Sequence, residues 1–377
     1  MRMVWASDLQ LSASPNGERL RSVFGAPAPP TLGLEEELML LDPVTLDLAP
    51  RAAEVIDGLD GRFALELPAS QLEIIVPASA TVREAVGHLA QSRADLARHT
   101  ELRLAGAGLH PFAATEGELN RSARYDTTVA EHGRIAHRQL VHALQVHVAI
   151  RGADRALAVH NALRSHLPEL AALAGNAPFY GGRDTGLASA RPPVSSLLPR
   201  QGIPPILSSW DAYARALELV GDPSRWWWEL RPHPAHGTLE IRVPDAQPTV
   251  ADAAAIAAVA HCLPVWLADR HDAGETLPAD ESWRIAENRW RACRHGVEGE
   301  LLDLGTGERM PARTRLHRLL DALEPVAERL DCAAELASAR RLVEVSGAMA
   351  LRAAAGRDGD PRRATEWLAN RFLDECP

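Results

Sequence analysis

Three consecutive acids, Glu35, Glu36 and Glu37, lie inside the otherwise apolar run 31–41. Such a run is typical of a β-strand, in which neighbouring side chains point to opposite faces. Glu35 and Glu37 therefore share one face of the predicted strand, and Glu36 points to the other. Carboxylates side by side on a sheet repel each other. The triplet thus has two interpretations: an exposed edge with solvated acids, or a site for a hard divalent cation, which prefers carboxylate oxygens.

Three more segments predicted as strands, the first of them broken into two strands at Pro68, carry polar groups that alternate with aliphatic residues. These groups are Glu66 and Glu73 in the segment 63–77, Gln145 and His147 in 143–150, and Glu240 and Arg242 in 237–243. Each pattern alone also fits an ordinary half-buried strand, with an outward carboxylate, a structural histidine, or a surface ion pair worth less than about 1 kcal/mol. Together they predict one acidic, oxygen-rich sheet face, which suits Mg²⁺ and the phosphates of a nucleotide.

The chain contains no lysine, so its 40 basic residues are all arginine. This composition excludes a phosphate loop of the Gly-Lys-Ser/Thr type and a lysine Schiff base. Arginine and metal ions would have to hold any nucleotide phosphates. The net charge of -10 shows no basic footprint for nucleic acid or for an anionic membrane surface, so neither is predicted as a partner.

The segment 1–30 is polar and ends in Ala-Pro-Ala-Pro-Pro, without the apolar core of a secretory signal. We predict a flexible leader over 1–30 and one catalytic domain over 31–377. The most apolar helical stretch, 251–268, is alanine-rich and interrupted by Asp252 and Pro264, which predicts a buried helix rather than a membrane span. Four cysteines without metal-type spacing are typical of a cytoplasmic protein.

Helical periodicity predicts the scaffold around the sheet. The predicted helices cover 81–105, 124–144, 154–174, 280–294, 316–330 and 333–355. Thr81, followed three residues later by Glu84, forms a capping box at the start of the first of them.

Several short motifs occur in a fixed order along residues 31–354. They are Gly33–Glu37, Ser70–Glu73, Arg138–Leu140 running into Val146–Val148, Gly182–Ser189, Gly237–Val243 with Asp245, and Glu287–Ala292. In this order the motifs resemble the carboxylate-amine ligases of the glutamate-cysteine ligase type 2 family. The resemblance implies an α+β, glutamine-synthetase-like fold, with a curved, mainly antiparallel sheet that forms a cleft and helices packed on its outer side.

The same resemblance implies ATP-dependent amide formation. Metal-bound ATP would phosphorylate a substrate carboxylate, and an amine would then attack the acyl phosphate. In the family, the carboxylate is taken to be the γ-carboxyl of glutamate and the amine that of cysteine, often with weak activity. The implied cofactors are ATP and Mg²⁺, or Mn²⁺ because oxygen ligands suit both ions. The partners would be these small molecules, and a homo-oligomer remains open.

Matching positions imply roles for individual residues. The Mg²⁺ ligands would be Glu35, Glu37, Glu66, Glu73 and Glu240. Catalysis would depend on Arg242, which would hold the transferring phosphate, and on Glu73 and His147. ATP would contact Gln145, Arg242, Asn288 and Arg291, and the substrate would contact Arg183, Asp184 and Arg191.

The substrate loop departs from the family pattern. Leu187 and Ala190 replace aromatic residues, Ala177 replaces a serine, and Gln145 replaces the first of two histidines. These departures bear on the amino-acid substrate more than on the ATP chemistry. Two alternatives remain open: a guanidino-type phosphotransferase on a related fold, and a catalytically weak member that acts in binding or regulation. A zinc hydrolase is disfavoured, because His147 has no histidine partner four residues away on a helix.

Overall fold

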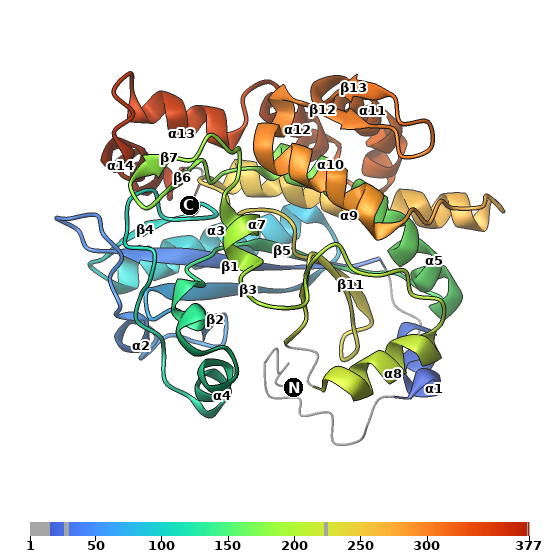
Figure 1. Cartoon of the computed structure of the whole chain (residues 1–377), viewed down its shortest axis with the longest axis horizontal. Helices are drawn as coiled ribbons and strands as arrows, with labels where there is room; N and C mark the ends of the chain where they lie inside the picture. Colours follow the sequence, from blue (N-terminus) through green and yellow to red (C-terminus); the bar gives the residue numbers. More distant parts are fainter. Residues whose placement is uncertain (1–15, 26–29, 222–224, 375, 377) are drawn as a thin grey trace.

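A seven-stranded antiparallel sheet lies at the centre of the computed structural model, which describes residues 16–25, 30–221, 225–374 and 376 (Figure 1). The strand order is β10 (Leu230–His233), β11 (Thr238–Ile241), β5 (Leu144–Ala149), β1 (Leu32–Leu41), β3 (Gln71–Ser79) and β2 (Phe63–Leu65), and β4 (Arg103–Ala105) also pairs with β1. The acidic strand β1 is central, because β3 and β5 pair with its two edges. The predicted α+β class with an antiparallel sheet is confirmed.

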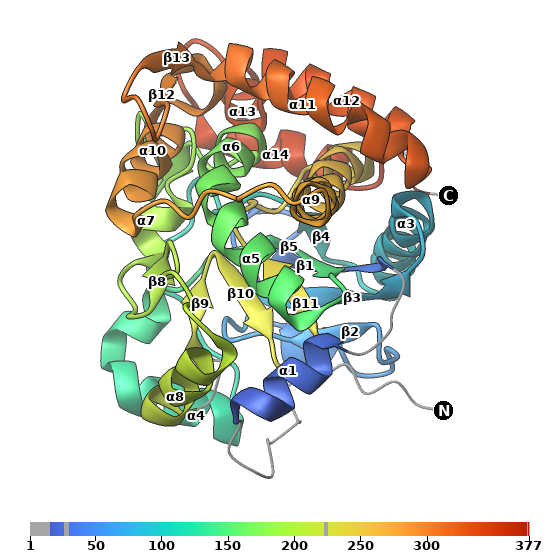
Figure 2. The ribbon, with the colours of Figure 1, turned by 90° about the vertical axis from the view of Figure 1, so that its right-hand side faces the viewer.

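Helices surround this sheet on several sides. They are α1 (Gly17–Gly25), α2 (Ala52–Val55), α3 (Val82–His99), α4 (Ala123–His132), α5 (Ala153–Leu163), α6 (Leu167–Ala174), α7 (Arg191–Ser195), α8 (Trp210–Val220), α9 (Val250–Asp272), α10 (Ser282–His295), α11 (Ala312–Arg329), α12 (Ala333–Glu344), α13 (Gly347–Ala355) and α14 (Pro361–Arg371). The two views agree that α11, α12 and α13 lie above the sheet and that α4 and α8 lie below it (Figures 1 and 2).

Three two-stranded sheets lie outside the central sheet. They pair β6 (Phe179–Tyr180) with β7 (Arg183–Asp184), β8 (Gln201–Gly202) with β9 (Trp227–Trp228), and β12 (Glu300–Leu302) with β13 (Arg309–Pro311). The pairing of β8 with β9 is parallel and sets Gln201 beside Trp227.

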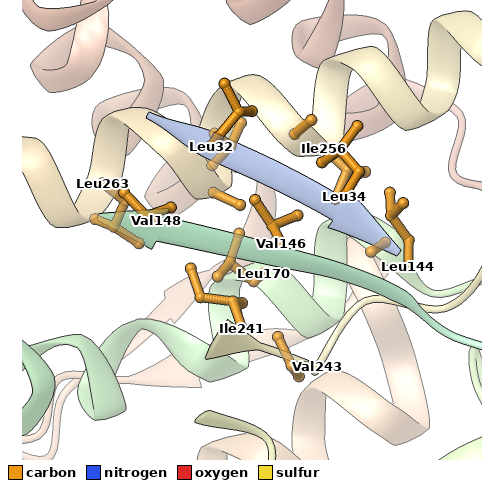
Figure 3. Close-up of a cluster of buried hydrophobic side chains, with 14 of the residues drawn as sticks. Leu32, Leu34, Leu144, Val146, Val148, Leu170, Ile241, Val243, Ile256 and Leu263 are labelled. Atoms are coloured by element: carbon orange, nitrogen blue, oxygen red, sulfur yellow. The ribbon is translucent and has the colours of Figure 1, made fainter. Parts of the chain in front are cut away.

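One face of the central sheet is apolar. Leu32 and Leu34 of β1 lie beside Val146 and Val148 of β5, facing Ile256 of α9 (Figure 3). Full burial of each such side chain contributes about 1.5–3 kcal/mol. Helix α9 has the length and apolar composition of a membrane span, but 89% of its apolar window is buried inside the protein. The prediction of a buried helix over 251–268 is therefore confirmed.

Four predicted helices are shorter or divided. The helix predicted over 81–105 ends at His99, and Arg103–Ala105 form β4 instead. Helix α4 ends at His132, because Gly133 has a φ of +59° and leads into a 3₁₀ segment. The helix predicted over 154–174 is divided by a 3₁₀ turn at 164–166, and that over 333–355 is divided where Ser346 caps α13. The capping box is confirmed, since the Thr81 side chain accepts the Glu84 N–H and the Glu84 carboxylate accepts the Ala80 N–H.

Part of the predicted leader is an ordered helix. Residues 17–25 form α1, whose Leu20 and Phe24 are buried in the main core, and the Phe24 ring stacks on Trp210 with centroids 4.4 Å apart. The expected flexibility therefore does not apply to α1, while residues 1–15 and 26–29 lie outside the described residues. The main apolar core draws side chains from positions as far apart as Leu20 and Phe372.

Candidate metal and substrate site

The face of the sheet opposite to α9 carries the predicted acids. Glu37 of β1 lies directly opposite Glu73 of β3, and Glu240 of β11 lies directly opposite His147 of β5. Side chains at directly opposed positions share a face. The exposed fraction of Glu37 is 8%, that of Glu73 is 7% and that of Glu240 is 1%. Because these acids are buried, the interpretation as a solvated edge is wrong.

Glu36 points to the other face, as the alternation predicts. Its carboxylate is fully buried and receives Nη2 and Nε of Arg93 at 2.5 and 2.8 Å. Arg93, on α3, also donates to the backbone carbonyls of Gln247 and Phe372. This ion pair ties β1 to the helical layer, so Glu36 belongs to the scaffold rather than to the site.

Two acids and one histidine converge on a point that could hold a metal ion. Glu35, His147 and Glu240 each offer one ligand atom, and these atoms lie within 4.8 Å of one another. Nδ1 of His147 is 3.0 Å from the Thr238 hydroxyl, while Nε2 lies 3.4 Å from Oε1 of Glu35 and has no hydrogen-bond partner among the described residues. Burial lowers the pKa of His147, but the Glu35 carboxylate outweighs it and raises the pKa overall. Such a donor set fits a divalent cation.

Three further acids lie beside this triad. Burial and the Glu66 carboxylate raise the pKa of Glu37 to about 7. Burial, followed by the carboxylates of Glu35, Glu66 and Glu37, raises the pKa of Glu73 well above its usual value. Burial also raises the pKa of Glu66, which follows the last residue of β2. Carboxylates crowded and buried in this way are neutralised by taking up protons or by binding a cation.

Two arginines hold Glu240 in its ionised form. Arg231 on β10 donates Nε and Nη2 to the Glu240 carboxylate at 2.7 and 2.9 Å. Arg242 donates to the Glu240 carboxylate and to the Gln145 side-chain oxygen. Burial alone raises the pKa of Glu240, but these two guanidinium groups outweigh it and hold the pKa well below the usual value. Sequence reasoning missed Arg231, although its position opposite Glu240 in a hairpin offered a signal.

A cavity of about 460 Å³ opens beside the acids. Its polar lining consists mainly of Glu37, Glu66, Gln71, Gln139, Arg191, Glu229, Arg242 and Arg289. Its apolar lining includes Leu67, Pro68, Val141, Pro192, Pro193, Leu198, Trp227, Ala286 and Trp290. The predicted cleft therefore exists, with the candidate metal ligands Glu37 and Glu66 in its wall.

The family model for glutamate-cysteine ligase family 2 matches residues 31–366. The chain belongs to this family. A Rubrobacter xylanophilus protein with the name "Putative glutamate-cysteine ligase 2-3" is 39% identical over 362 residues, which cover 92% of this chain and 98% of the relative. A Frankia alni protein with the name "Putative glutamate-cysteine ligase 2-1" is 33% identical over 365 residues, covering 92% and 96%.

The fold is also that of a solved ligase. The crystal structure of the glutamate-cysteine ligase of Francisella tularensis, in complex with AMP, superposes with a TM-score of 0.69 at 14% identity. The match covers 93% of this chain and 90% of the Francisella chain. This likeness confirms the predicted ligase-type fold.

Some residues of the family motifs lie away from the cavity. Asn288 donates to and accepts from the backbone of Leu302, both at 2.7 Å. Arg291 pairs with Glu287 at 2.9 Å, Asp184 is held by two 2.7 Å contacts from Arg352, and Arg183 is exposed on β7. Of the four residues Arg183, Asp184, Asn288 and Arg291, none belongs to the described cavity lining. Their predicted contacts with ATP or substrate therefore have no support from this geometry.

Helix α10 instead presents a different face to the cavity. Ala286, Arg289, Trp290 and Cys293 line it, at the 3-, 4- and 7-residue spacings of a single helix face. Arg289 donates to both carboxylate oxygens of Glu229 at 2.8 Å. The motif over 287–292 includes Arg289 and Trp290. Which face of the helix turns towards the cavity, however, depends on the position of the sheet.

Arg191 is the one predicted substrate-loop residue among the described cavity-lining residues. Its Nε is 2.7 Å from Oδ1 of Asp245, and its Nη2 donates to the carbonyl of Val243 at 2.6 Å. Asp245 also accepts the backbone N–H of Asn176. Asp245 therefore fixes the guanidinium at the cavity wall.

Proposed function

We propose that this protein is an ATP-dependent carboxylate-amine ligase. The observation that carries the proposal is the buried acidic sheet face, where Glu35, His147 and Glu240 converge beside Glu37, Glu66 and Glu73 at the end of a cavity. Membership of the ligase family and the shared fold support it. Glutamate and cysteine, which the names of the relatives specify, are the first substrates to test.

The donor sets fit two divalent cations, Mg²⁺ or Mn²⁺. Glu35, His147 and Glu240 would hold one, and Glu37, Glu66 and Glu73 would hold the other. Bound cations would neutralise the phosphates and polarise the transferring phosphoryl group. We propose that ATP is the phosphoryl donor. Because the chain contains no lysine, arginine would be the basic side chain that binds the ATP phosphates.

The chain's own residues would prepare the transfer. Arg242 lies between Glu240 and Gln145, where its remaining donors can bind equatorial phosphoryl oxygens in the transition state. Arg191, fixed by Asp245, would orient a substrate carboxylate in the cavity. Burial of the acidic face would protect an acyl phosphate from hydrolysis by water.

Trapping with hydroxylamine tests the proposal without knowledge of the natural amine. Purified protein, Mg-ATP, a panel of carboxylates that includes glutamate, and hydroxylamine should yield ADP and a hydroxamate. The Arg242→Gln variant should lose hydroxamate formation by about 10²-fold or more. The exposed Glu366→Gln variant is the charge-loss control.

The alternatives give different results in the same assay. A guanidino-type phosphotransferase would release ADP and phosphorylate an acceptor, but it would form no hydroxamate with any carboxylate. A binding or regulatory protein would bind Mg-ATP without releasing ADP.

We place the ligase in the cytoplasm, since Cys262, Cys293 and Cys332 are buried free thiols.

A further inference from the structure

The wall of the cavity changes character with distance from the acids. Glu37, Glu66 and Arg242 form the acidic end of the wall. Proline, leucine, valine and tryptophan side chains form one part of the rest, and glutamine, serine, arginine and glutamate side chains form the other part. Pro68, Pro192 and Pro193 have no backbone N–H, so the apolar part of the wall offers few hydrogen-bond donors. It is therefore suited to an apolar group rather than to a polar one.

Two tryptophans give this wall its shape. Trp227 is half-buried, held by the pairing of β9 with β8 and by an edge contact with the His132 ring at 5.8 Å between centroids. Trp290 lines the cavity from α10 but is 53% exposed, which places it towards the solvent side. Indole rings provide large, rigid contact surfaces for aromatic ligands and for the ammonium group of an amine.

Charge in the same wall is already compensated. Arg289 makes a bidentate contact with Glu229 at 2.8 Å, and Arg191 is paired with Asp245. Every arginine among the described lining residues, Arg242 with Glu240 included, thus has a carboxylate partner. We assign Arg191 to the carboxylate of the first substrate. The carboxylate of an amine such as cysteine would therefore have to compete both with that substrate and with the protein partners of the arginines.

The cavity would have to hold the first substrate as well as the amine. Its volume of about 460 Å³ falls within the range of roughly 300–1,000 Å³ that accommodates drug-sized ligands. Leu187 and Ala190 of the substrate loop pack in the small apolar cluster that also contains the wall residue Val141.

Resting on the proposed ligase function, we propose that the acceptor is an amine carrying an aromatic or bulky apolar group and no carboxylate. Its nitrogen would attack the carbonyl carbon of the acyl phosphate. The carbon–oxygen bond to phosphate would break, its electron pair would leave with phosphate, and the nitrogen's proton would pass to the released phosphate. The apolar group would lie between Trp227 and Trp290.

An amine panel tests this inference, with the carboxylate that gives hydroxamate as the first substrate. Benzylamine, 2-phenylethylamine and tryptamine are compared with cysteine, cysteamine and ethylamine, and amide product is measured by mass. We expect the kcat/KM of the best aromatic amine to exceed that of cysteine at least tenfold. The ratio of kcat/KM for 2-phenylethylamine to that for ethylamine should fall at least fivefold in Trp290→Ala and recover in Trp290→Phe.

Trp283 provides a matched control on the same helix. It lies seven residues before Trp290, is 68% exposed and is not among the described lining residues of the cavity, so Trp283→Ala should leave the ratio unchanged. Preference for cysteine, or an equal fall of the ratio in both alanine variants, would overturn the inference and leave the ligase standing. Absence of hydroxamate with every carboxylate would overturn the ligase and the inference with it.

Discussion

Glu37 and Glu73 lie directly opposite each other on neighbouring antiparallel strands, with both carboxyl groups buried on the same face of the sheet. Directly opposed like charges destabilise a sheet, and burial adds the cost of desolvation. The fold thus retains a locally unfavourable pair where the proposed chemistry needs it. Removal of either carboxylate should therefore increase the stability of the metal-free protein and impair its function.

The Glu73→Gln variant tests this separation. Removing one carboxylate should raise the free energy of unfolding of the metal-free protein by about 1–2 kcal/mol, because burial and three neighbouring acids raise the pKa of Glu73. The same change should weaken the rise in melting temperature that Mg²⁺ or Mn²⁺ gives the wild type. Melting curves with and without metal measure both effects, and Glu366→Gln should show neither. A less stable metal-free variant would contradict the proposed repulsion.

The buried pair of Glu36 and Arg93 should behave in the opposite way. Replacing Arg93 by Met leaves a fully buried carboxylate without its partner, which costs about 3–5 kcal/mol. The double variant Glu36→Leu/Arg93→Met should recover much of this loss, because no charge remains buried. Urea unfolding measures the difference. Equal instability of the single and double variants would show that the backbone contacts of Arg93, rather than the ion pair, dominate.

His110 should make stability depend on pH. Its Nε2 donates to the carbonyl of Leu46 at 2.8 Å, while Nδ1 accepts the N–H groups of Phe112 and Ala113, so the folded state holds the neutral ring. Burial lowers the pKa of His110 to about 4. The unfolded chain takes up a proton near pH 6.5, and the folded chain does not. The contribution of the neutral His110 ring to stability is therefore fully present above about pH 6.5. The free energy of unfolding falls by up to about 3 kcal/mol as the pH approaches 4.

The His110→Asn variant isolates this effect. Asparagine can still accept an N–H bond at the position of Nδ1 but does not titrate. Between pH 7 and 4.5, the free energy of unfolding measured in urea should fall less steeply for the variant than for the wild type. The difference in slope should correspond to the uptake of up to one proton on unfolding. Parallel curves would mean that other buried histidines, such as His142, account for the pH dependence.

Arg183 and Arg191 should differ sharply in activity assays. The Arg191→Ala variant should lower kcat/KM for hydroxamate formation by about 10²-fold, because it removes a fixed donor from the cavity wall. Arg183 is exposed on β7, so Arg183→Ala should stay within about twofold of the wild type. Melting curves of both variants separate loss of function from loss of folding. A large loss in Arg183→Ala would restore the substrate role predicted for that residue.

Cys262 and Cys332 should form a disulfide under mild oxidation. Their sulfur atoms lie 3.5 Å apart, between α9 and the start of α12. Diamide, which is reduced to the hydrazine as two thiols become one disulfide, should lower the protein mass by about two hydrogens per bond. The link should stabilise the fold by about 2–4 kcal/mol. Cys332→Ser, treated in the same way, should show neither change, and oxidation that lowers the melting temperature would indicate strain.

Much of the acidic face could be predicted from sequence, because the period of a strand does not depend on its partners. Alternation alone placed Glu35 and Glu37 on one face and Glu36 on the other, and it paired Gln145 with His147 correctly. The family motifs then indicated which of these faces meet.

Partners brought by the fold could not be predicted in this way. Arg93 binds an acid from a distant element, and no local pattern marks it as a partner. Helix α10 shows the same limit, because its motif contains both Asn288, which faces β12, and Arg289, which faces the cavity. The choice between neighbouring residues depends on which side of the helix the sheet occupies.

Arg93 also links the order of synthesis to the order of folding. It is separated by 279 residues from Phe372, whose carbonyl it binds and whose ring lies 4.7 Å from its guanidinium carbon. At about 5–20 residues per second, a ribosome needs roughly 15–55 s to add that intervening stretch. Every strand of the central sheet has been made long before then. In a nascent chain, Arg93 can therefore pair with Glu36 long before the Phe372 carbonyl has been translated, so this contact between the first strands and the C-terminal segment forms late.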